Sequence, residues 1–213
     1  MGAAVGTFLN ACIHDLPLGR SVAWPLRSDA SYGRLRPFIE LLTATMFAAA
    51  FWYYGPTALF LSRVVLGCAL IVLFVVDLEH RLLPNVITLP GIVIGFAFSF
   101  VTGPGWRSSL IGIAVGGGIL FATAEVYYRM RKAEGLGMGD VKMLAMIGAF
   151  LGWPATLLTL MMGSMAGSIV GLVLIVLRRG DMKYGLPFGT FLAMGAALSA
   201  TIGAPLIDWY LKQ

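Results

Sequence analysis

Leu59 to Arg81 reads LFLSRVVLGCALIVLFVVDLEHR, and this stretch decides what kind of protein the chain can be. Its first 18 residues carry a single charge, on Arg63, and a membrane-spanning helix needs about 20 predominantly apolar residues. The run therefore predicts a membrane helix that ends at Asp77. A carboxylate at the edge of a bilayer is costly unless it has a partner or a function. Asp77 is thus the first candidate functional residue.

The composition of the whole chain agrees with this class. Hydrophobic residues make up 59% of the sequence, charged residues make up 12%, and the mean hydropathy is +0.87. A soluble domain carries roughly 25% charged residues. The 27 glycines also suit membrane helices, which pack closely through small residues. The chain is predicted to be an all-α, polytopic membrane helix bundle that lies in a lipid bilayer.

The apolar runs set the number of expected spans. They cover residues 38–54, 57–76, 86–101, 109–128, 141–153, 154–177 and 187–210. Glycine and proline residues separate them, which is typical of turns between helices. The apolar start, residues 1–13, is too short to cross a bilayer. It is either a partial helix or a start that was trimmed or misassigned. We expect seven transmembrane helices, or eight with the N-terminal segment.

The basic residues orient these spans. When alternate loops are assigned to one side, that side holds 12 of the 15 Lys and Arg residues. Cytoplasmic loops carry such an excess, so we expect the loop that follows Asp77 to be cytoplasmic and the C-terminus to lie outside. Arg63 falls in the outer part of its span, where we expect it to extend its charge outward. No basic run is interleaved with aromatic residues, so we expect no nucleic-acid partner.

A second acidic loop lies on the same predicted side. It reads Gly137-Met138-Gly139-Asp140 and precedes the apolar run 141–153. Asp140 starts a helix, where the helix dipole favours an ionised carboxylate, whereas Asp77 ends one, where the dipole favours the protonated form. One ionised and one protonated carboxyl group is what aspartic proteolysis requires. The alternative from the residues alone is that both acids only face lipid headgroups.

Four more charged residues are candidates for substrate binding. Glu79 and Lys142 lie two residues past the two aspartates, and Glu40 and Glu125 lie near the cytoplasmic ends of spans. Each also has a structural interpretation, as a solvated loop residue or as a side chain that reaches the headgroups. Gly116 to Gly118 and the spaced glycines 163, 167 and 171 indicate close helix packing.

These motifs together resemble the type IV prepilin leader peptidase family. The resemblance rests on GLGMGDVK at 135–142, DLEHRLLPN at 77–85, GTFLNACIHDLP at 6–17 and LPFGT at 186–190. It implies that Asp77 and Asp140 are the catalytic aspartates of a GxGD membrane peptidase and that Gly137 and Gly139 support the motif. The implied reaction removes the short basic leader from prepilins or pseudopilins, after a glycine, on the cytoplasmic side of the bacterial inner membrane. The resemblance also implies that such precursors carry an apolar helix after the leader.

The resemblance also divides the chain. Residues 1–37 would form a partial N-terminal helix and a shortened cytoplasmic loop, and residues 38–213 the transmembrane peptidase core. Many members carry two CxxC pairs in that first loop, whereas this loop has no cysteine past Cys12, so we expect no zinc and no metal. The peptidase reaction needs no cofactor.

Two further functions stay open at this stage. The first is a second family activity, N-methylation of the new N-terminus, which would use S-adenosylmethionine. The second, from a different class, is a proton- or cation-coupled transporter that uses the same acids. The oligomeric state does not follow from the sequence.

Overall fold

A computed structural model describes residues 2–18, 36–132, 137–177 and 186–211. The described residues form helices and no strands, which confirms the predicted all-α fold. Loop residues 19–35 and Gly135 of the sequence analysis lie outside the described residues. The helices are α1 (Gly2–Asp15), α2 (Arg36–Tyr54), α3 (Ala58–His80), α4 (Asn85–Phe98), α5 (Trp106–Arg131), α6 (Met138–Leu151), α7 (Trp153–Val176) and α8 (Phe188–Leu211).

The helix ends follow local sequence signals. The Thr57 hydroxyl accepts a hydrogen bond from the Phe60 N–H and so caps the start of α3. Arg81 adopts a left-handed conformation with φ 55° and donates its N–H to the Asp77 carbonyl, which ends α3. Gly152, with φ 76°, turns the chain between α6 and α7, where Pro154 occupies the first turn.

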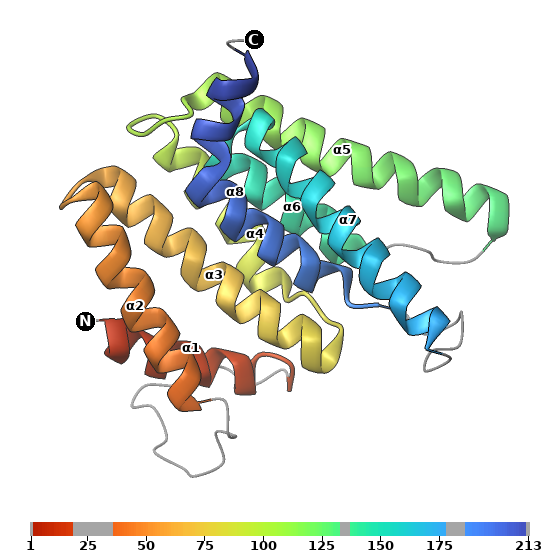
Figure 1. Cartoon of the computed structure of the whole chain (residues 1–213), viewed down its shortest axis with the longest axis horizontal. Helices are drawn as coiled ribbons and strands as arrows, with labels where there is room; N and C mark the ends of the chain where they lie inside the picture. The colour runs from red at the N-terminus through yellow and green to blue at the C-terminus, as the bar shows by residue number, and fades with distance from the viewer. Residues whose placement is uncertain (1, 19–35, 133–136, 178–185, 212–213) are drawn as a thin grey trace.

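Three helices are long and apolar enough to cross a membrane, and these are α3, α5 and α7. The shorter apolar helices include α4 and the apolar part of α8. The expected number of seven or eight spans therefore stays a prediction. The N-terminal segment is a helix of 14 residues, α1, which packs against α2 and α3. The short apolar start thus forms a helix that lies on the bundle (Figure 1).

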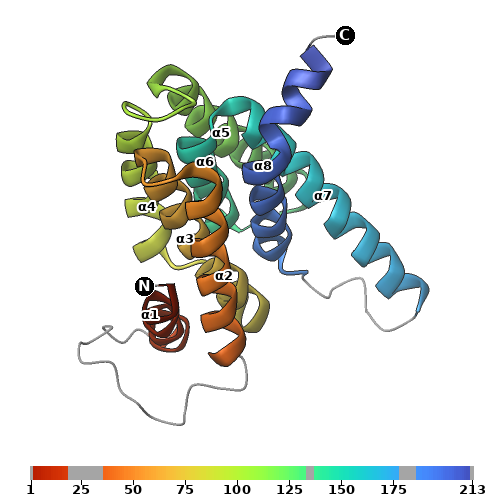
Figure 2. The same cartoon turned by 60° about the vertical axis from the view of Figure 1, so that its left-hand side comes forward.

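Helix α6 lies at the centre of the bundle, among α3, α4, α5, α7 and α8 (Figures 1 and 2). Its residues from Asp140 to Leu151 are buried, with one exception, Lys142. Met143, Leu144, Met146 and Ile147 are fully enclosed. A helix that is apolar on nearly all sides belongs in the interior of a bundle, and α6 occupies that position.

Glycines let the neighbours of α6 approach its backbone. A Cβ atom at Gly112 of α5 would lie 2.5 Å from the Gly148 carbonyl oxygen, and one at Gly116 would lie 2.7 Å from the Leu144 oxygen. A Cβ at Gly148 would in turn collide with the Gly112 carbonyl. The expected close packing is therefore present at Gly116, whereas Gly118 faces open space.

The pairs of contacting residues also give the helix directions. Gly112 meets Gly148 while Gly116 meets Leu144, so α5 and α6 are antiparallel. Gly91 of α4 meets Met146 and Gly95 meets Phe150, so α4 and α6 are parallel. Because α4 starts directly after α3 ends, the end of α3 and the start of α6 lie at the same end of the bundle. Asp77 and Asp140 are carried there together.

We expect Gly112→Ala to destabilise the protein, because its methyl group would press on the Gly148 carbonyl at the tightest contact of α5 with α6. Overpacking of this kind costs about 1–3 kcal/mol, which corresponds to a Tm lower by roughly 2–12 °C. Thermal unfolding in detergent measures the change. Gly118→Ala is the matched control on the same helix and should not lower Tm, because alanine favours helix. Equal losses in the two variants would contradict the packing argument.

Candidate active site

Asp77 lies in the last turn of α3 and is 5% exposed. Valine and leucine side chains of the same helix, including Leu73 and Val76, are fully buried around it. The carboxyl group therefore sits where apolar packing gives way to the helix end. A buried carboxylate needs hydrogen-bond partners to be tolerated.

Thr190 supplies those partners. The Asp77 Oδ2 atom accepts hydrogen bonds from the Thr190 backbone N–H, at 2.7 Å, and from its hydroxyl, at 3.0 Å. Thr190 is in the first turn of α8, where backbone N–H groups have no partner within the helix. The positive end of a helix dipole also favours an anion. These contacts favour the ionised form of Asp77, whereas burial opposes it.

Asp140 lies in the first turn of α6, which is not one of the three long apolar helices, and is 8% exposed. A Cβ at Gly137 would lie 3.3 Å from the Asp140 Oδ2 atom, so the carboxyl group folds back over Gly137. Burial, and then the charge of Asp77, raise the pKa of Asp140 to about 7, although a hydrogen bond with the Gly137 backbone lowers it. The two carboxyl groups therefore interact.

This result corrects one expectation. The dipole at the start of α6 was predicted to favour an ionised Asp140, but its pKa is raised. The reason is one of magnitude, because a helix dipole contributes less than about 2 kcal/mol, whereas burial and a neighbouring like charge shift a pKa by several units.

Leu83 links the two carboxyl-bearing segments. A Cβ at Gly139 would lie 2.8 Å from the Leu83 Cβ. A Cβ at Gly189 would lie 3.0 Å from both Leu83 Cδ1 and Asp77 Oδ2. Leu83 thus contacts the glycine before Asp140 and the glycine before Thr190. Both glycines are required there because any side chain would displace Leu83 or the Asp77 carboxylate.

Of the four predicted binding residues, two lie near the pair in the sequence and are exposed. The Lys142 ammonium donates a hydrogen bond of 2.9 Å to the Asn85 side chain and so joins the starts of α6 and α4. The Glu79 Oε2 atom lies 3.8 Å from the His80 Nε2 atom.

The other two form ion pairs within their own helices. Glu40 pairs with Arg36 at 3.1 Å and also accepts a hydrogen bond from Thr7, and Glu125 pairs with Arg129 at 2.7 Å. Neither ion pair includes one of the aspartates.

Sequence reasoning missed the roles of Thr190, Gly189 and Leu83. Their signal was present in the LPFGT and DLEHRLLPN stretches, but only as family resemblance. The contact of Thr190 with Asp77 joins residues 113 positions apart, and no local pattern reports such a pairing.

Within the described ranges, no cluster of three or more His, Cys, Asp or Glu residues could hold a metal ion. Cys12 and Cys68 are free thiols. Fold and site thus define a membrane helix bundle with two interacting, buried carboxyl groups at one end.

The family model of the type IV leader peptidase family matches residues 64–172, a range that includes both aspartates. A prepilin leader peptidase/N-methyltransferase of Burkholderia pseudomallei strain K96243 is 34% identical over 96% of this chain and 84% of its own length. The chain belongs to the type IV leader peptidase family. The alignment with this relative runs over 262 residues, more than the 213 of the chain, so the relative carries residues without a counterpart here.

Relatives with the same name occur in Aeromonas hydrophila, at 33% identity over 83% of this chain, and in Pseudomonas aeruginosa, at 30% over 86%. The chain spans 61% and 63% of the length of these two proteins. No solved structure matches the chain.

The raised pKa of Asp140 predicts how stability depends on pH. An unfolded aspartate has a pKa of about 3.9, so the folded protein holds this proton to higher pH. The bound proton therefore stabilises the folded protein. This contribution to stability is fully present below about pH 4 and is lost as the pH rises through about 7. The Asp140→Asn variant has no such proton to lose, so it should be more stable than the wild type at pH 8 and similar to it near pH 4.5.

Thermal unfolding in detergent across this pH range measures the difference. Glu125→Gln, which removes an exposed carboxyl, is the control and should keep the wild-type slope. The same slope in wild type and Asp140→Asn would show that Asp140 is not buried as a proton-holding group.

Proposed function

We propose that this protein is a membrane aspartic endopeptidase that removes the short basic leader from type IV prepilins or pseudopilins, after a glycine. The observation that carries the proposal is the buried, interacting pair Asp77 and Asp140, both inside the matched family region. The names of the relatives support a peptidase and give no support to the transporter alternative. Lys and Arg distribution supports a cytoplasmic site in the bacterial inner membrane and a C-terminus outside.

The contacts support a role for each carboxyl group. Asp77, which accepts two hydrogen bonds from Thr190, would be the ionised partner and would take a proton from the attacking water. Asp140, whose pKa is raised to about 7, holds its proton and would donate a hydrogen bond to the scissile carbonyl. This assignment reverses the one expected from helix dipoles.

The exposed side chains near the pair suit leader binding. Glu79 is two residues past Asp77, and its carboxylate could attract a basic leader. Lys142 is two residues past Asp140. Roles for Glu40 and Glu125 in a substrate path stay predictions, because both are already paired with arginines.

N-methylation is a second candidate, because the relatives are named for both activities. The stretch at residues 6–17 matches the family in the sequence, and polar side chains in it are engaged within the protein. The Asn10 amide donates to the carbonyls of Gly6 and Arg36, and the Thr7 hydroxyl contacts Glu40. These residues offer no unpaired donor set for S-adenosylmethionine, so we derive no step through it. Mass spectrometry of a processed pilin, with the cofactor present, separates the two activities.

Asp77→Asn and Asp140→Asn should each leave the protein folded and reduce leader removal by about 10²–10⁴-fold, the usual size of a lost acid or base. Gel analysis of a precursor in reconstituted vesicles measures the cleavage. Gly118→Ala, at a position of α5 that faces open space, should cleave at the wild-type rate. Full cleavage by either aspartate variant would overturn the proposed mechanism.

Thr190→Val keeps the size of the side chain and removes one of the two hydrogen bonds to Asp77. A hydrogen bond to a charged group contributes about 1.5–3 kcal/mol, so kcat should fall roughly tenfold to a hundredfold with little change in KM. Thr190→Ser retains the hydroxyl and should restore most of the rate. If valine and serine behaved alike in initial-rate assays, the hydroxyl would not position Asp77.

A further inference from the structure

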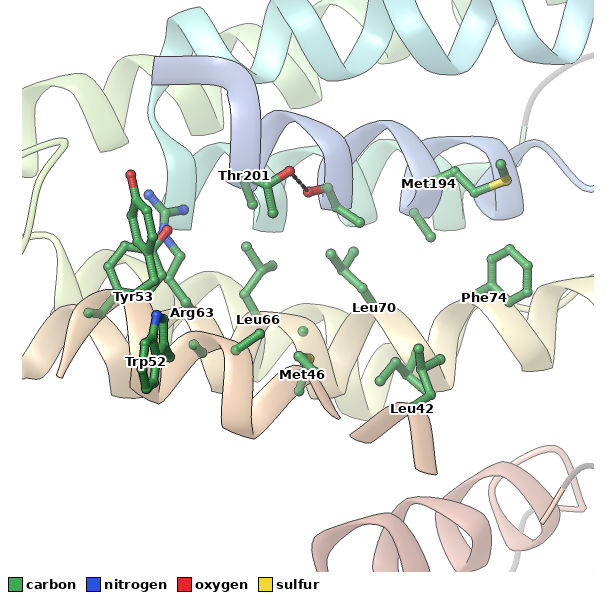
Figure 3. Close-up of a pocket in the computed structure, with 18 of the residues that line it drawn as sticks. Leu42, Met46, Trp52, Tyr53, Arg63, Leu66, Leu70, Phe74, Met194 and Thr201 are labelled. Carbon is green, nitrogen blue, oxygen red and sulfur yellow. Dashed lines mark hydrogen bonds between the residues drawn. The ribbon is translucent and has the colours of Figure 1, made fainter. Parts of the chain in front are cut away.

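A large apolar groove lies between α2, α3 and α8 (Figure 3). Its volume is about 890 Å³. Helix α3 forms the floor with Leu66, Gly67 and Leu70, and the walls include Met46 of α2 and Met194 of α8. Both walls pack on α3, whereas the described parts of α2 and α8 do not contact each other. We call this feature the α2/α8 groove.

We propose that the α2/α8 groove binds the apolar helix that follows the cleaved leader in the substrate. This inference rests on the proposed function and names where the substrate docks. A valley between two helices on a common third helix has the shape that a fourth helix fills.

The side chains of the groove suit a helix. Small residues, among them Ala49 and Ala197, line it and are exposed, and small residues allow helix backbones to approach closely in a membrane. Met46, which covers Gly67, and Met194 are unbranched and adapt to different partner surfaces.

One end of the groove, which we call the inner end, is lined by Phe74 and Met194 and leads to the two aspartates. Phe74 lines the groove and is three residues before Asp77, within one turn of α3. Met194 lines the opposite wall and is four residues past Thr190, about one turn of α8. A helix in the groove therefore directs its N-terminal end toward Asp77, where the leader joins it.

The outer end of the groove carries an arginine with two unsatisfied donors. Arg63 lines it beside Trp52 and Tyr53 (Figure 3). The Arg63 Nε and Nη1 atoms are buried and have no hydrogen-bond partner, although the guanidinium interacts with Tyr54. The expectation that Arg63 extends its charge outward stays a prediction. Buried donors without acceptors are unfavourable, so this end of the groove is complementary to an acceptor or acidic group on the occupant.

The separation of Arg63 and Asp77 along α3 predicts where the substrate helix would carry that acceptor. Arg63 is 14 residues before Asp77 on α3, which corresponds to about 21 Å at a rise of 1.5 Å per residue. A substrate helix that lies along α3 has the same rise. Its acceptor would then lie about 14 residues past the cleavage site.

Photocrosslinking tests the docking site. The probe is a synthetic precursor with a basic leader, a glycine at the cleavage site and an apolar helix of about 20 residues, in phosphatidylethanolamine/phosphatidylglycerol vesicles. Benzoylphenylalanine replaces Met194 in the Asp140→Asn background, which keeps the precursor intact. The control position is Met165, an exposed methionine of α7 outside the groove.

We expect at least tenfold more precursor adduct from position 194 than from position 165. Equal yields from the two positions, or adducts from position 194 with phospholipid alone, would overturn the proposal. The second outcome would identify the groove as a lipid site.

A cleavage assay of the wild-type protein in the same vesicles, compared with the crosslinking from position 194, separates this inference from the proposed function. Cleavage without a position-194 adduct would refute the docking site alone. An adduct without cleavage would refute the peptidase proposal and leave the docking site supported.

Two substitutions test the groove by kinetics. Ala197→Trp fills the groove from an exposed position and should raise KM for the precursor about tenfold, whereas Leu172→Trp on the exposed face of α7 should not. Arg63→Gln should raise KM for a precursor with glutamate 14 residues past the cleavage site more than for one with leucine there. Unchanged KM values in Ala197→Trp, with a wild-type Tm, would contradict the proposal.

Discussion

The contact between Asp77 and Thr190 is the interaction on which the site depends. A carboxylate that is 5% exposed at the end of an apolar helix is tolerated only with donors at hand, and the first turn of α8 supplies two of them. This contact fixes the start of α8 against the end of α3. The same pair of helices forms the floor and one wall of the α2/α8 groove. The position of the carboxyl group and the shape of the groove therefore have a common origin.

The second carboxyl group is held by backbone packing. Helix α6 is enclosed by its neighbours, and glycines of α5 and α4 bring helix backbones or large side chains directly against it. Such contacts have no rotatable side chain that could absorb a shift. Asp140 is thus carried on a rigid element, and Gly139 and Leu83 fix the approach of its loop to that of Asp77. Rigid placement keeps two interacting carboxyl groups together despite their repulsion.

The helices could be predicted because glycine, proline or charged residues separate the apolar runs. The run 57–76 corresponds to α3, and the run 141–153 corresponds to α6. That Asp77 and Asp140 lie at the same end of the bundle could be predicted because two helices, α4 and α5, lie between α3 and α6 in the chain. Thr190 could not, because its role comes from tertiary contact. The protonation of Asp140 was misjudged because burial, which a sequence does not report, outweighs the preference set by the helix dipole.

Charge alone is a poor basis for recognising a basic leader at this site. The predicted cytoplasmic segments hold 12 Lys and Arg residues, so a basic peptide that approaches them meets like charge at long range. Glu79 gives only a local, exposed attraction, and exposed ion pairs contribute about 0–1 kcal/mol. Under the proposed function, the affinity for a precursor would come largely from its apolar helix, which would enter within the bilayer and avoid the basic surface. An apolar groove that starts one turn from Asp77 satisfies this requirement, and a leader without its helix would bind weakly.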